Sequence, residues 1–158
     1  MEKLFEQYVE GWLRRRLVPG VRLTAQAARH SLCQHNGSAM FRLEPDLLLE
    51  QGQQAWVLDT KWKRLDAAER QNKYGLSQAD FYQLYAYGQK YLAGRGEMAL
   101  IYPCTAQFSE PLPAFDFNSE LRLWVLPFDL DKDVLWAADD VSFMRCLSQP
   151  DQSWPRSA

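Results

Sequence analysis

The chain has 158 residues, of which 47% are hydrophobic and 24% charged, and its formal net charge is −2. These values are ordinary for a globular protein, and the length is enough for one domain with a substantial core. A negative net charge argues against a protein that coats nucleic acid through bulk positive charge. No apolar run approaches the length of a membrane-spanning helix, and no signal-peptide pattern follows Lys3.

The three cysteines are odd in number and widely spaced, at Cys33, Cys104 and Cys146. This spacing argues against a disulfide framework and favours a reducing compartment, so we expect a cytoplasmic protein. We also expect a single domain over residues 1–148 and a frayed tail over residues 149–158.

The positive charge is concentrated in two segments. Residues 1–30 hold six Lys and Arg against three Glu, and residues 61–73 hold five Lys and Arg against one Asp and one Glu. Such segments suit local contact with phosphates. Chance clustering on a solvated surface explains the charge equally well.

Residues 2–16 predict an amphipathic helix, because apolar side chains recur at helical spacing from Leu4 to Leu13. Glu6 falls on the edge of the apolar face, where a glutamate is usually solvated. The run Arg14-Arg15-Arg16 ends the helix, where cations suit the helix dipole. Phosphate contact is the alternative role for these arginines, and we favour the dipole.

The next segment contains a predicted strand and a doubtful metal motif. Val21, Leu23 and Ala25 alternate with polar residues, which favours a strand. His30, Cys33 and His35 match no standard zinc spacing and have no evident fourth ligand. A turn at residues 35–38 is expected to lead through residues 40–43 into the following hairpin.

The most informative stretch is EPDLLLEQGQQAWVLDTKWK, at residues 44–63. Two apolar runs, at 47–49 and 55–58, flank a polar tetrad at 51–54. This pattern predicts a β-hairpin with a four-residue loop.

The predicted hairpin brings two aspartates face to face. With Glu50 opposite Ala55, counting outward places Asp46 opposite Asp59, with Cβ atoms roughly 5 Å apart. Lys61 points the same way as Asp59, because side chains alternate along a strand. At an effective dielectric near 20 the two carboxylates repel by about 3 kcal/mol, which a hard divalent cation would relieve. Lys61 acting as the only counterion is the alternative.

A second helix is predicted from Gln78 to Ala93, with Ser77 as its N-cap. Asp80, Gln83 and Tyr87 fall on one polar-aromatic face of this helix. Ordinary hydrogen bonds on a wet flank are the alternative reading of that face.

The C-terminal third predicts two strands and a helix. The strands cover residues 98–102 and 121–126, each closed by a proline, with an irregular loop at 108–118 between them. The aspartates of residues 129–133 resemble the start of a calcium loop, but Val134 stands where glycine is required. We therefore expect them to cap a helix over residues 134–147.

In this order the motifs resemble the PD-(D/E)xK nuclease signature, with Pro45-Asp46 followed by Asp59-Thr60-Lys61. More narrowly, PDLLL at 45–49, LDTKWK at 58–63 and DFYQLYAY at 80–87 resemble the McrC subunit family of 5-methylcytosine restriction systems. The resemblance covers about residues 2–130. It implies an α/β, restriction-endonuclease-like core with a central mixed β-sheet flanked by helices, which the order of the predicted elements also matches.

The resemblance implies hydrolysis of DNA phosphodiester bonds with Mg²⁺, for which Mn²⁺ can substitute. Asp46, Asp59, Glu6 and the Thr60 backbone carbonyl would hold the metal. Lys61 would orient the attacking water and neutralise the transition state.

Supporting residues and partners are implied as well. Gln83 would contact the Lys61 neighbourhood or the DNA backbone, Tyr87 a phosphate, and Lys63 would assist DNA binding. McrC-type subunits carry a further N-terminal region that docks to an McrB-like AAA+ GTPase. Here Met1 stands at the first helix, so we expect an isolated catalytic domain or a stand-alone relative. The residues leave the oligomeric state open.

Two other functions stay open at this stage. The chain could be a catalytically silent DNA-binding or scaffold module of the same fold, or it could cleave another phosphodiester, such as RNA or a branched junction. The complete set of Asp46, Asp59 and Lys61 favours an enzyme, because a silent module has no need for a costly carboxylate pair.

Overall fold

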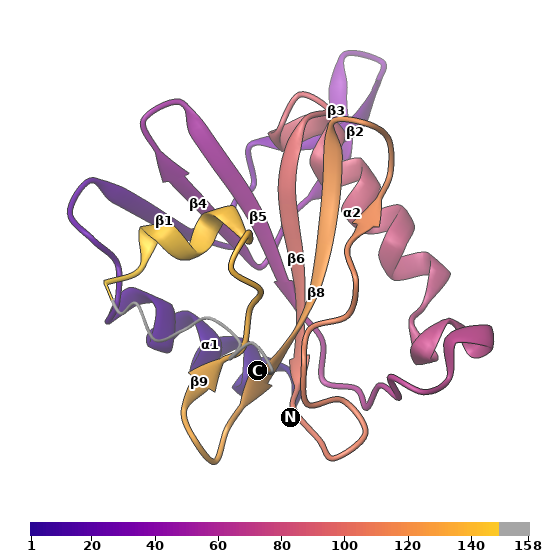
Figure 1. Ribbon diagram of the computed structural model, residues 1–158. Helices are drawn as coiled ribbons and strands as arrows, with labels where there is room; N and C mark the ends of the chain where they lie inside the picture. Colours follow the sequence, from indigo (N-terminus) through magenta and orange to yellow (C-terminus); the bar gives the residue numbers. More distant parts are fainter. Residues whose placement is uncertain (149–158) are drawn as a thin grey trace.

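The computed structural model describes residues 1–148, and the expected tail at 149–158 lies outside the described residues. Its elements in chain order are α1 (Glu2–Arg14), β1 (Val21–Ala25), β2 (His30–His35), β3 (Ser38–Leu43), β4 (Leu47–Gln51), β5 (Gln54–Thr60), η1 (Arg70–Gly75), α2 (Gln78–Tyr91), β6 (Gly96–Pro103), β7 (Phe115–Asp116), β8 (Leu121–Asp129), β9 (Val134–Leu135) and η2 (Ser142–Cys146). Figure 1 shows the sheet between α1 and η2 on one face and α2 on the other.

The central sheet has seven strands in the order β1-β4-β5-β6-β8-β7, with β9 also paired to β8. The strands β5, β6 and β8 run parallel, and all other pairs are antiparallel. The predicted fold class is therefore confirmed: a mixed central sheet flanked by helices, consistent with a restriction-endonuclease-like fold. The strands β2 and β3 pair only with each other, outside this sheet.

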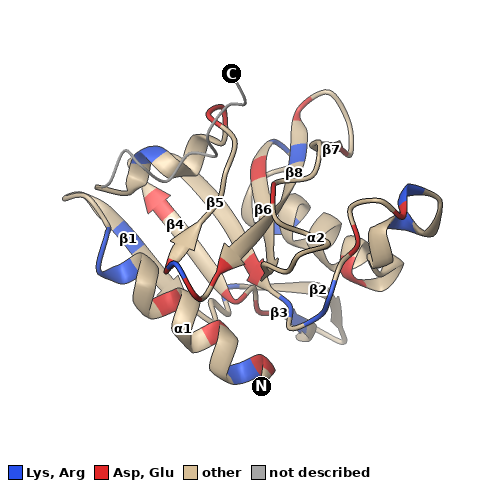
Figure 2. Ribbon diagram, turned by 60° about the horizontal axis from the view of Figure 1, so that its bottom comes forward, with Lys and Arg blue, Asp and Glu red and all other residues tan. Residues whose placement is uncertain are grey.

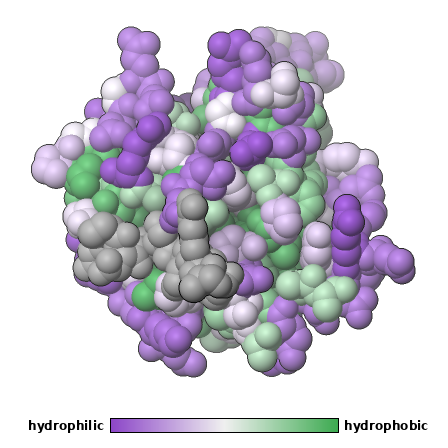
Figure 3. Space-filling model, in the orientation of Figure 1, coloured by the Kyte–Doolittle hydropathy of each residue, from purple (hydrophilic) through white to green (hydrophobic). Residues whose placement is uncertain are grey.

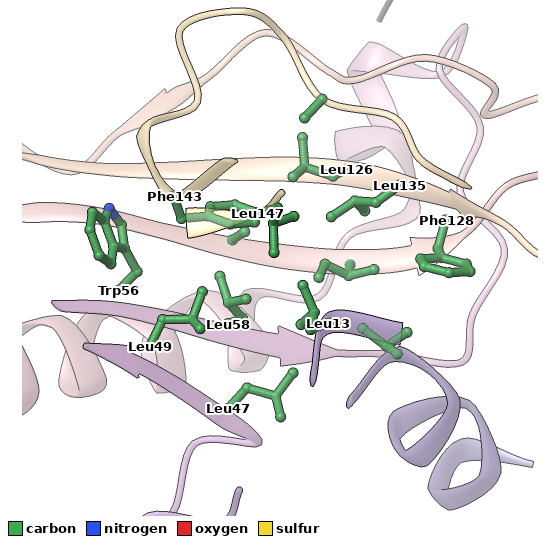
Figure 4. Packing of buried hydrophobic residues seen from close by; sticks show 14 of the residues in the cluster. Leu13, Leu47, Leu49, Trp56, Leu58, Leu126, Phe128, Leu135, Phe143 and Leu147 are labelled. Carbon is green, nitrogen blue, oxygen red and sulfur yellow. The ribbon is translucent and has the colours of Figure 1, made fainter. Parts of the chain in front are cut away.

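Two apolar cores cover the two faces of the sheet, because side chains alternate along each strand. One core joins α1 and the C-terminal segment to Leu47, Leu49 and Leu58. The other joins α2 to Leu48 and Val57. Figure 4 shows the first core, with side chains from α1, the sheet and the C-terminal segment converging. Each fully buried leucine stabilises the fold by about 1.5–3 kcal/mol.

The helix predicted at 2–16 is confirmed as α1, which ends at Arg14. Just beyond it, the Arg16 guanidinium donates to the carbonyl of Trp12 at 3.2 Å and lies 4.3 Å over the centre of the Trp12 ring. The side chain of Arg14 pairs with Glu10 at 2.8 Å. The Arg16 contact with a carbonyl in the last turn is the kind of interaction that the favoured dipole role predicts, whereas Arg14 pairs with a side chain.

The predicted hairpin is confirmed as β4 and β5 in the expected register, with Glu50 opposite Ala55. Its loop is shorter than expected, because Gln51 pairs with Gln54 and leaves only a two-residue turn. Gly52, at φ 60°, supplies the left-handed conformation that such a turn needs. Both loops give the same register, so the facing position of Asp46 and Asp59 is unaffected.

The helix predicted at 78–93 is confirmed as α2, which ends at Tyr91. The Ser77 hydroxyl accepts a hydrogen bond from the backbone N–H of Asp80 at 3.4 Å and caps the first turn. This cap fixes the start of α2 beside the carboxyl end of β5.

The helix expected at residues 134–147 is wrong. Val134 and Leu135 form β9, which pairs with the end of β8, and only Ser142–Cys146 form a short 3₁₀ turn. Asp129 accepts from the Lys132 N–H at 3.0 Å and closes the β8–β9 turn instead of capping a helix. The apolar side chains of this segment complete the core beside α1 in a strand-like order, with Leu135 and Ala137 both buried.

Pro127 does not close its strand as expected, because β8 continues to Asp129. The Pro127 carbonyl accepts from the Trp136 N–H at 3.0 Å, on the β9 side of the strand. The Pro127 nitrogen, which has no hydrogen to donate, also faces β9. Its pairing with β6 therefore loses no hydrogen bond.

Polar residues cover most of the face seen in Figure 3, and hydrophobic residues show mainly between them. No helix within residues 1–148 has the length and apolar character needed to span a membrane.

Candidate active site

The two predicted aspartates meet where β4 begins and the parallel strand β5 ends. Asp46 directly precedes β4. Asp59 is the second-to-last residue of β5 and pairs with Leu100 of β6. The carboxyl end of parallel strands is where α/β sheets usually bind their ligands. In Figure 2, acidic positions mark both this end of the central strands and α1 beside it.

Backbone and side-chain hydrogen bonds hold the two carboxylates in place. The Asp46 N–H donates to Asp59 Oδ1 at 2.9 Å. The N–H and the hydroxyl of Thr60 both donate to Asp46 Oδ2, at 2.8 and 2.9 Å. Hydrogen bonds to a charged group are worth about 1.5–3 kcal/mol each, so the pair is firmly oriented.

Lys61 provides positive charge beside this pair. Its Nζ lies 3.2 Å from Asp59 Oδ2 and 3.6 Å from Asp80 Oδ1, and it donates to Gln83 Oε1 at 3.2 Å. The ammonium is therefore fixed by one residue of β5 and two of α2. Burial by itself would lower the pKa of Lys61, but the carboxylates of Asp59 and Asp80 outweigh burial and raise it.

Glu6 reaches the site from α1. It is buried, with 8% of its surface exposed, so the solvated flank that its place on the helix wheel favoured is wrong. The Gln26 amide donates to Glu6 Oε2 at 2.7 Å and to Asp46 Oδ1 at 3.4 Å, and Lys3 pairs with Glu6 at 3.0 Å. One glutamine side chain thus links the acid on the helix to an acid on the sheet.

The pKa values of the two aspartates show that negative charge is crowded here. Burial and, next, the Asp46 carboxylate raise the pKa of Asp59 to about 7, against the opposing effect of Lys61. Burial also raises the pKa of Asp46; hydrogen bonds from Thr60 oppose that rise, and the Glu6 carboxylate adds to it. A site that resists holding both charges is one that a divalent cation would stabilise.

The residues fit a Mg²⁺ ion in their donor chemistry, since every donor is a hard oxygen. The Lys61 N–H donates to the Ile101 carbonyl of β6. In a trans peptide the preceding C=O points the opposite way, so the Thr60 carbonyl is directed to the β4 side, where Asp46 lies. Within residues 1–148, however, no three His, Cys, Asp or Glu side chains are already gathered as a metal-binding group. Binding would therefore draw Glu6 and the aspartates closer together.

The remaining predicted residues lie around this centre. Gln83 contacts Lys61 directly. Tyr87 is buried, and its hydroxyl donates to the Glu44 carbonyl at 3.3 Å, which supports the turn that carries Asp46. This position fits a supporting residue better than an exposed phosphate ligand. Lys63 is exposed and lines a surface pocket of about 400 Å³ with Trp62 and Arg64.

Two residues of this site, Gln26 and Asp80, were not identified from the sequence. Gln26 has no motif around it and joins the site only through the fold. Asp80 was visible on the same helical face as Gln83, and its carboxylate adds a second negative partner for Lys61. The spacing of Asp80 and Gln83, three residues apart on a helix, was the available signal.

Comparison with known proteins gives a family match and matches to solved structures. A family described as McrBC 5-methylcytosine restriction system component matches residues 1–103. No curated protein sequence matches the chain.

One of the similar solved structures is the half-complex from the tetradecameric assembly of Thermococcus gammatolerans McrB AAA+ hexamers with bound McrC. The TM-score is 0.62 at 19% identity, over 84% of this chain and 29% of that chain. The present chain thus spans less than a third of the length of the chain it resembles, and at this identity the likeness concerns the fold.

Proposed function

This chain belongs to the McrBC 5-methylcytosine restriction system component family, and from that premise we propose that it is a metal-dependent DNA endonuclease. The observation that carries the proposal is the arrangement at the end of β5, where Asp46, Asp59 and Lys61 meet. It has the composition of a PD-(D/E)xK site. The proposal extends to a role as the cleavage subunit of a methylation-dependent restriction system.

The residues would divide the work by their chemistry. Asp46, Asp59, Glu6 and the Thr60 carbonyl would hold Mg²⁺, which when bound lowers the pKa of water and stabilises charge on the scissile phosphate. Lys61 is held by Asp59 and Gln83 beside these oxygens, so its ammonium can orient the water and neutralise the developing charge. Mn²⁺, with similar ligand preferences, would replace Mg²⁺.

The partners follow from the family. DNA is the substrate, and an McrB-like AAA+ GTPase is the proposed protein partner, as in the assembly that the fold resembles. The three cysteines are free, which suits the reducing cytoplasm in which such a system would meet foreign DNA.

The test is cleavage of supercoiled and linear DNA in Mg²⁺ or Mn²⁺ by purified protein, with Asp59→Ala and Lys61→Ala alongside. Each change should lower the rate about 100-fold or more, because it removes a charge that acts on the metal or the transition state. Glu120→Gln is the control, since its exposed pair with Arg95 lies at the opposite end of β6. Undiminished cleavage by Lys61→Ala would contradict the assignment.

The main competing function is a catalytically silent DNA-binding or scaffold module. It is favoured by the fact that, within residues 1–148, no three potential metal-ligating side chains are already grouped. If the wild type is inert, the assay is repeated with the AAA+ GTPase and GTP added. Continued inactivity, with no Mg²⁺ binding by calorimetry, would leave the scaffold function. A panel of single-stranded DNA, duplex DNA and RNA would identify the substrate.

A further inference from the structure

The strands β2 and β3 form a two-stranded ribbon that stands apart from the central sheet (Figure 1). Most of its residues are exposed on both strands. An isolated two-stranded hairpin is at best marginally stable, so an exposed ribbon of this kind suggests that it has a function.

Both ends of the ribbon are fixed next to the candidate active site. It begins shortly after Gln26, which binds Glu6 and Asp46, and its second strand ends three residues before Asp46. The Tyr91 hydroxyl of α2 lies 2.6 Å from the Leu43 carbonyl and accepts from the Arg29 N–H at 3.1 Å. The base is thus anchored to α2, while the rest projects.

The exposed part of the ribbon presents an apolar pair. Leu32 and Phe41 do not pair themselves, but they lie across the ribbon from each other, between the pairs Ser31–Arg42 and Cys33–Met40. Leu32 is 50% exposed and Phe41 66% exposed. Phe41 also has a φ of 60°, a strained conformation for a bulky residue and one that concentrates at functional positions.

The charge of this region complements a polyanion. Residues 30–43, which form the ribbon, contain Arg42 and no Asp, Glu or Lys, in a chain whose net charge is −2. Arg42 is exposed beside Phe41, and within residues 1–148 no carboxylate pairs with it. An exposed aromatic flanked by an unpaired arginine is a combination that proteins use against the bases and phosphates of nucleic acids.

We propose that the β2–β3 ribbon binds the duplex DNA substrate beside the cut, with Phe41 and Leu32 packed against the bases and Arg42 on a phosphate. A two-stranded ribbon fits a DNA groove in its dimensions. This inference rests on the proposed function, because it places the DNA by reference to Asp46 and Asp59.

The chain itself limits how far from the cut this contact lies. Asp46 follows Phe41 by five positions along the chain, so their Cα atoms are at most about 18 Å apart. At about 3.4 Å of duplex per base pair, the ribbon contacts DNA within about five base pairs of the scissile phosphate.

The test is binding of a fluorescein-labelled 20-base-pair duplex, measured by anisotropy in Ca²⁺. Phe41→Gly should weaken binding about fivefold or more, because the apolar side chain packed against the bases is lost. Its melting temperature should be equal or higher, because glycine relieves the positive φ. Phe41→Tyr, which keeps the aromatic ring, should bind like the wild type. Arg42→Gln should reduce the salt-dependence slope of binding by about 1.

Two controls match these variants. Tyr82 on α2 is also 66% exposed. It lies two residues, and thus about 200° around the helix, from the buried Leu84, so Tyr82→Ala should not affect binding. Arg95→Gln removes an exposed arginine at the far end of β6. Binding by Phe41→Gly equal to that of the wild type would overturn the ribbon inference and leave the nuclease proposal standing.

Two further outcomes separate DNA binding from other roles of the ribbon. If the variants bind DNA normally but lose binding to the AAA+ GTPase, the ribbon is a protein-binding surface and the DNA inference is wrong. If the wild type neither binds nor cleaves duplex DNA, even with the AAA+ GTPase and GTP added, the proposed function itself fails, and the ribbon inference fails with it.

Discussion

At the scale of single residues, the site is defined by charges that the fold crowds together. Asp59 is 2% exposed, and Lys61 alone is not enough to keep its pKa in the usual range. Between pH 3.8 and about 7 the folded protein therefore holds a proton on Asp59 that the unfolded chain has released. The stability that this proton contributes is present at low pH and is lost as pH rises through this window.

Asp59→Asn should therefore raise the free energy of unfolding of the metal-free protein at pH 8 by about 2 kcal/mol. The full shift of the pKa would give about 4 kcal/mol, and the loss of the Lys61 ion pair offsets part of it. The measurement is urea denaturation in EDTA at pH 5 and pH 8. The gain should shrink at pH 5, and Glu120→Gln, an exposed control, should show neither effect. A gain that is the same at both pH values would contradict this prediction.

Gln26 should control metal affinity, because its amide positions both Glu6 and Asp46. Gln26→Ala should raise the Mg²⁺ concentration for half-maximal cleavage about tenfold or more, as expected when a residue that orients metal ligands is removed. Gln26→Asn keeps an amide and tolerates the φ of 52° but is too short to bridge, so it should behave like Gln26→Ala.

The control for these variants is Gln53→Ala, in the turn at the far end of the same hairpin. An unchanged Mg²⁺ requirement in Gln26→Ala would show that Glu6 and Asp46 reach the metal without this link.

At the scale of secondary-structure elements, α2 connects the site to the second core. Its first turns carry Asp80 and Gln83 to Lys61, and its last turn holds the β2–β3 ribbon through Tyr91. Between them, Gly88 packs so closely on the sheet that a Cβ would lie 2.8 Å from Leu121 Cδ2. The position of the helix over the sheet thus depends on a residue without a side chain.

Gly88→Ala should lower the free energy of unfolding by about 1 kcal/mol, because overpacking exceeds the gain in helix propensity. Gly11→Ala in α1 is the matched control. Its added Cβ meets only the Arg15 guanidinium at 3.4 Å, so the change should stabilise by about 0.5–1 kcal/mol. Urea denaturation of both variants measures the difference. Equal stabilisation of the two would show that Leu121 and Met98 make room without cost.

At the scale of the whole molecule, the sheet is held between two cores, while the β2–β3 ribbon is anchored only at its base, where both of its chain ends meet Tyr91. The strands β5, β6 and β8 are largely buried, and each has neighbouring strands on both edges. The strands β2 and β3 have no such cover. Stability should therefore be distributed unevenly, with the site at the border between a rigid and a more easily opened region.

Amide hydrogen exchange followed by mass spectrometry should show this difference. Peptides from β6 should exchange slowest, through global unfolding, and peptides from residues 31–42 should exchange much faster. Added duplex DNA should slow exchange in the ribbon and leave β6 unchanged. Protection of the free ribbon as strong as that of β6 would contradict the prediction.

The sequence alone determined the centre of the site. Asp46, Asp59 and Lys61 are set by a hairpin between neighbouring segments. The expected four-residue loop and the observed two-residue turn share one register, so alternation places these side chains on one face in either case. The same local signals predicted α1 and α2, because helical spacing and the Ser77 cap lie within each segment. These interactions involve residues close in the chain, so the pattern of residues is sufficient to identify them.

Only the tertiary structure decided how distant segments complete the site. Glu6 is buried because α1 packs against the end of the sheet, and Gln26 joins the site across a loop that no motif marks. The segment at 134–147 has apolar residues that suit a helix, but a free strand edge at β8 pairs with β9 instead. Such choices depend on which surface is left uncovered once the other elements have packed, and that surface is not encoded in any one stretch of the chain.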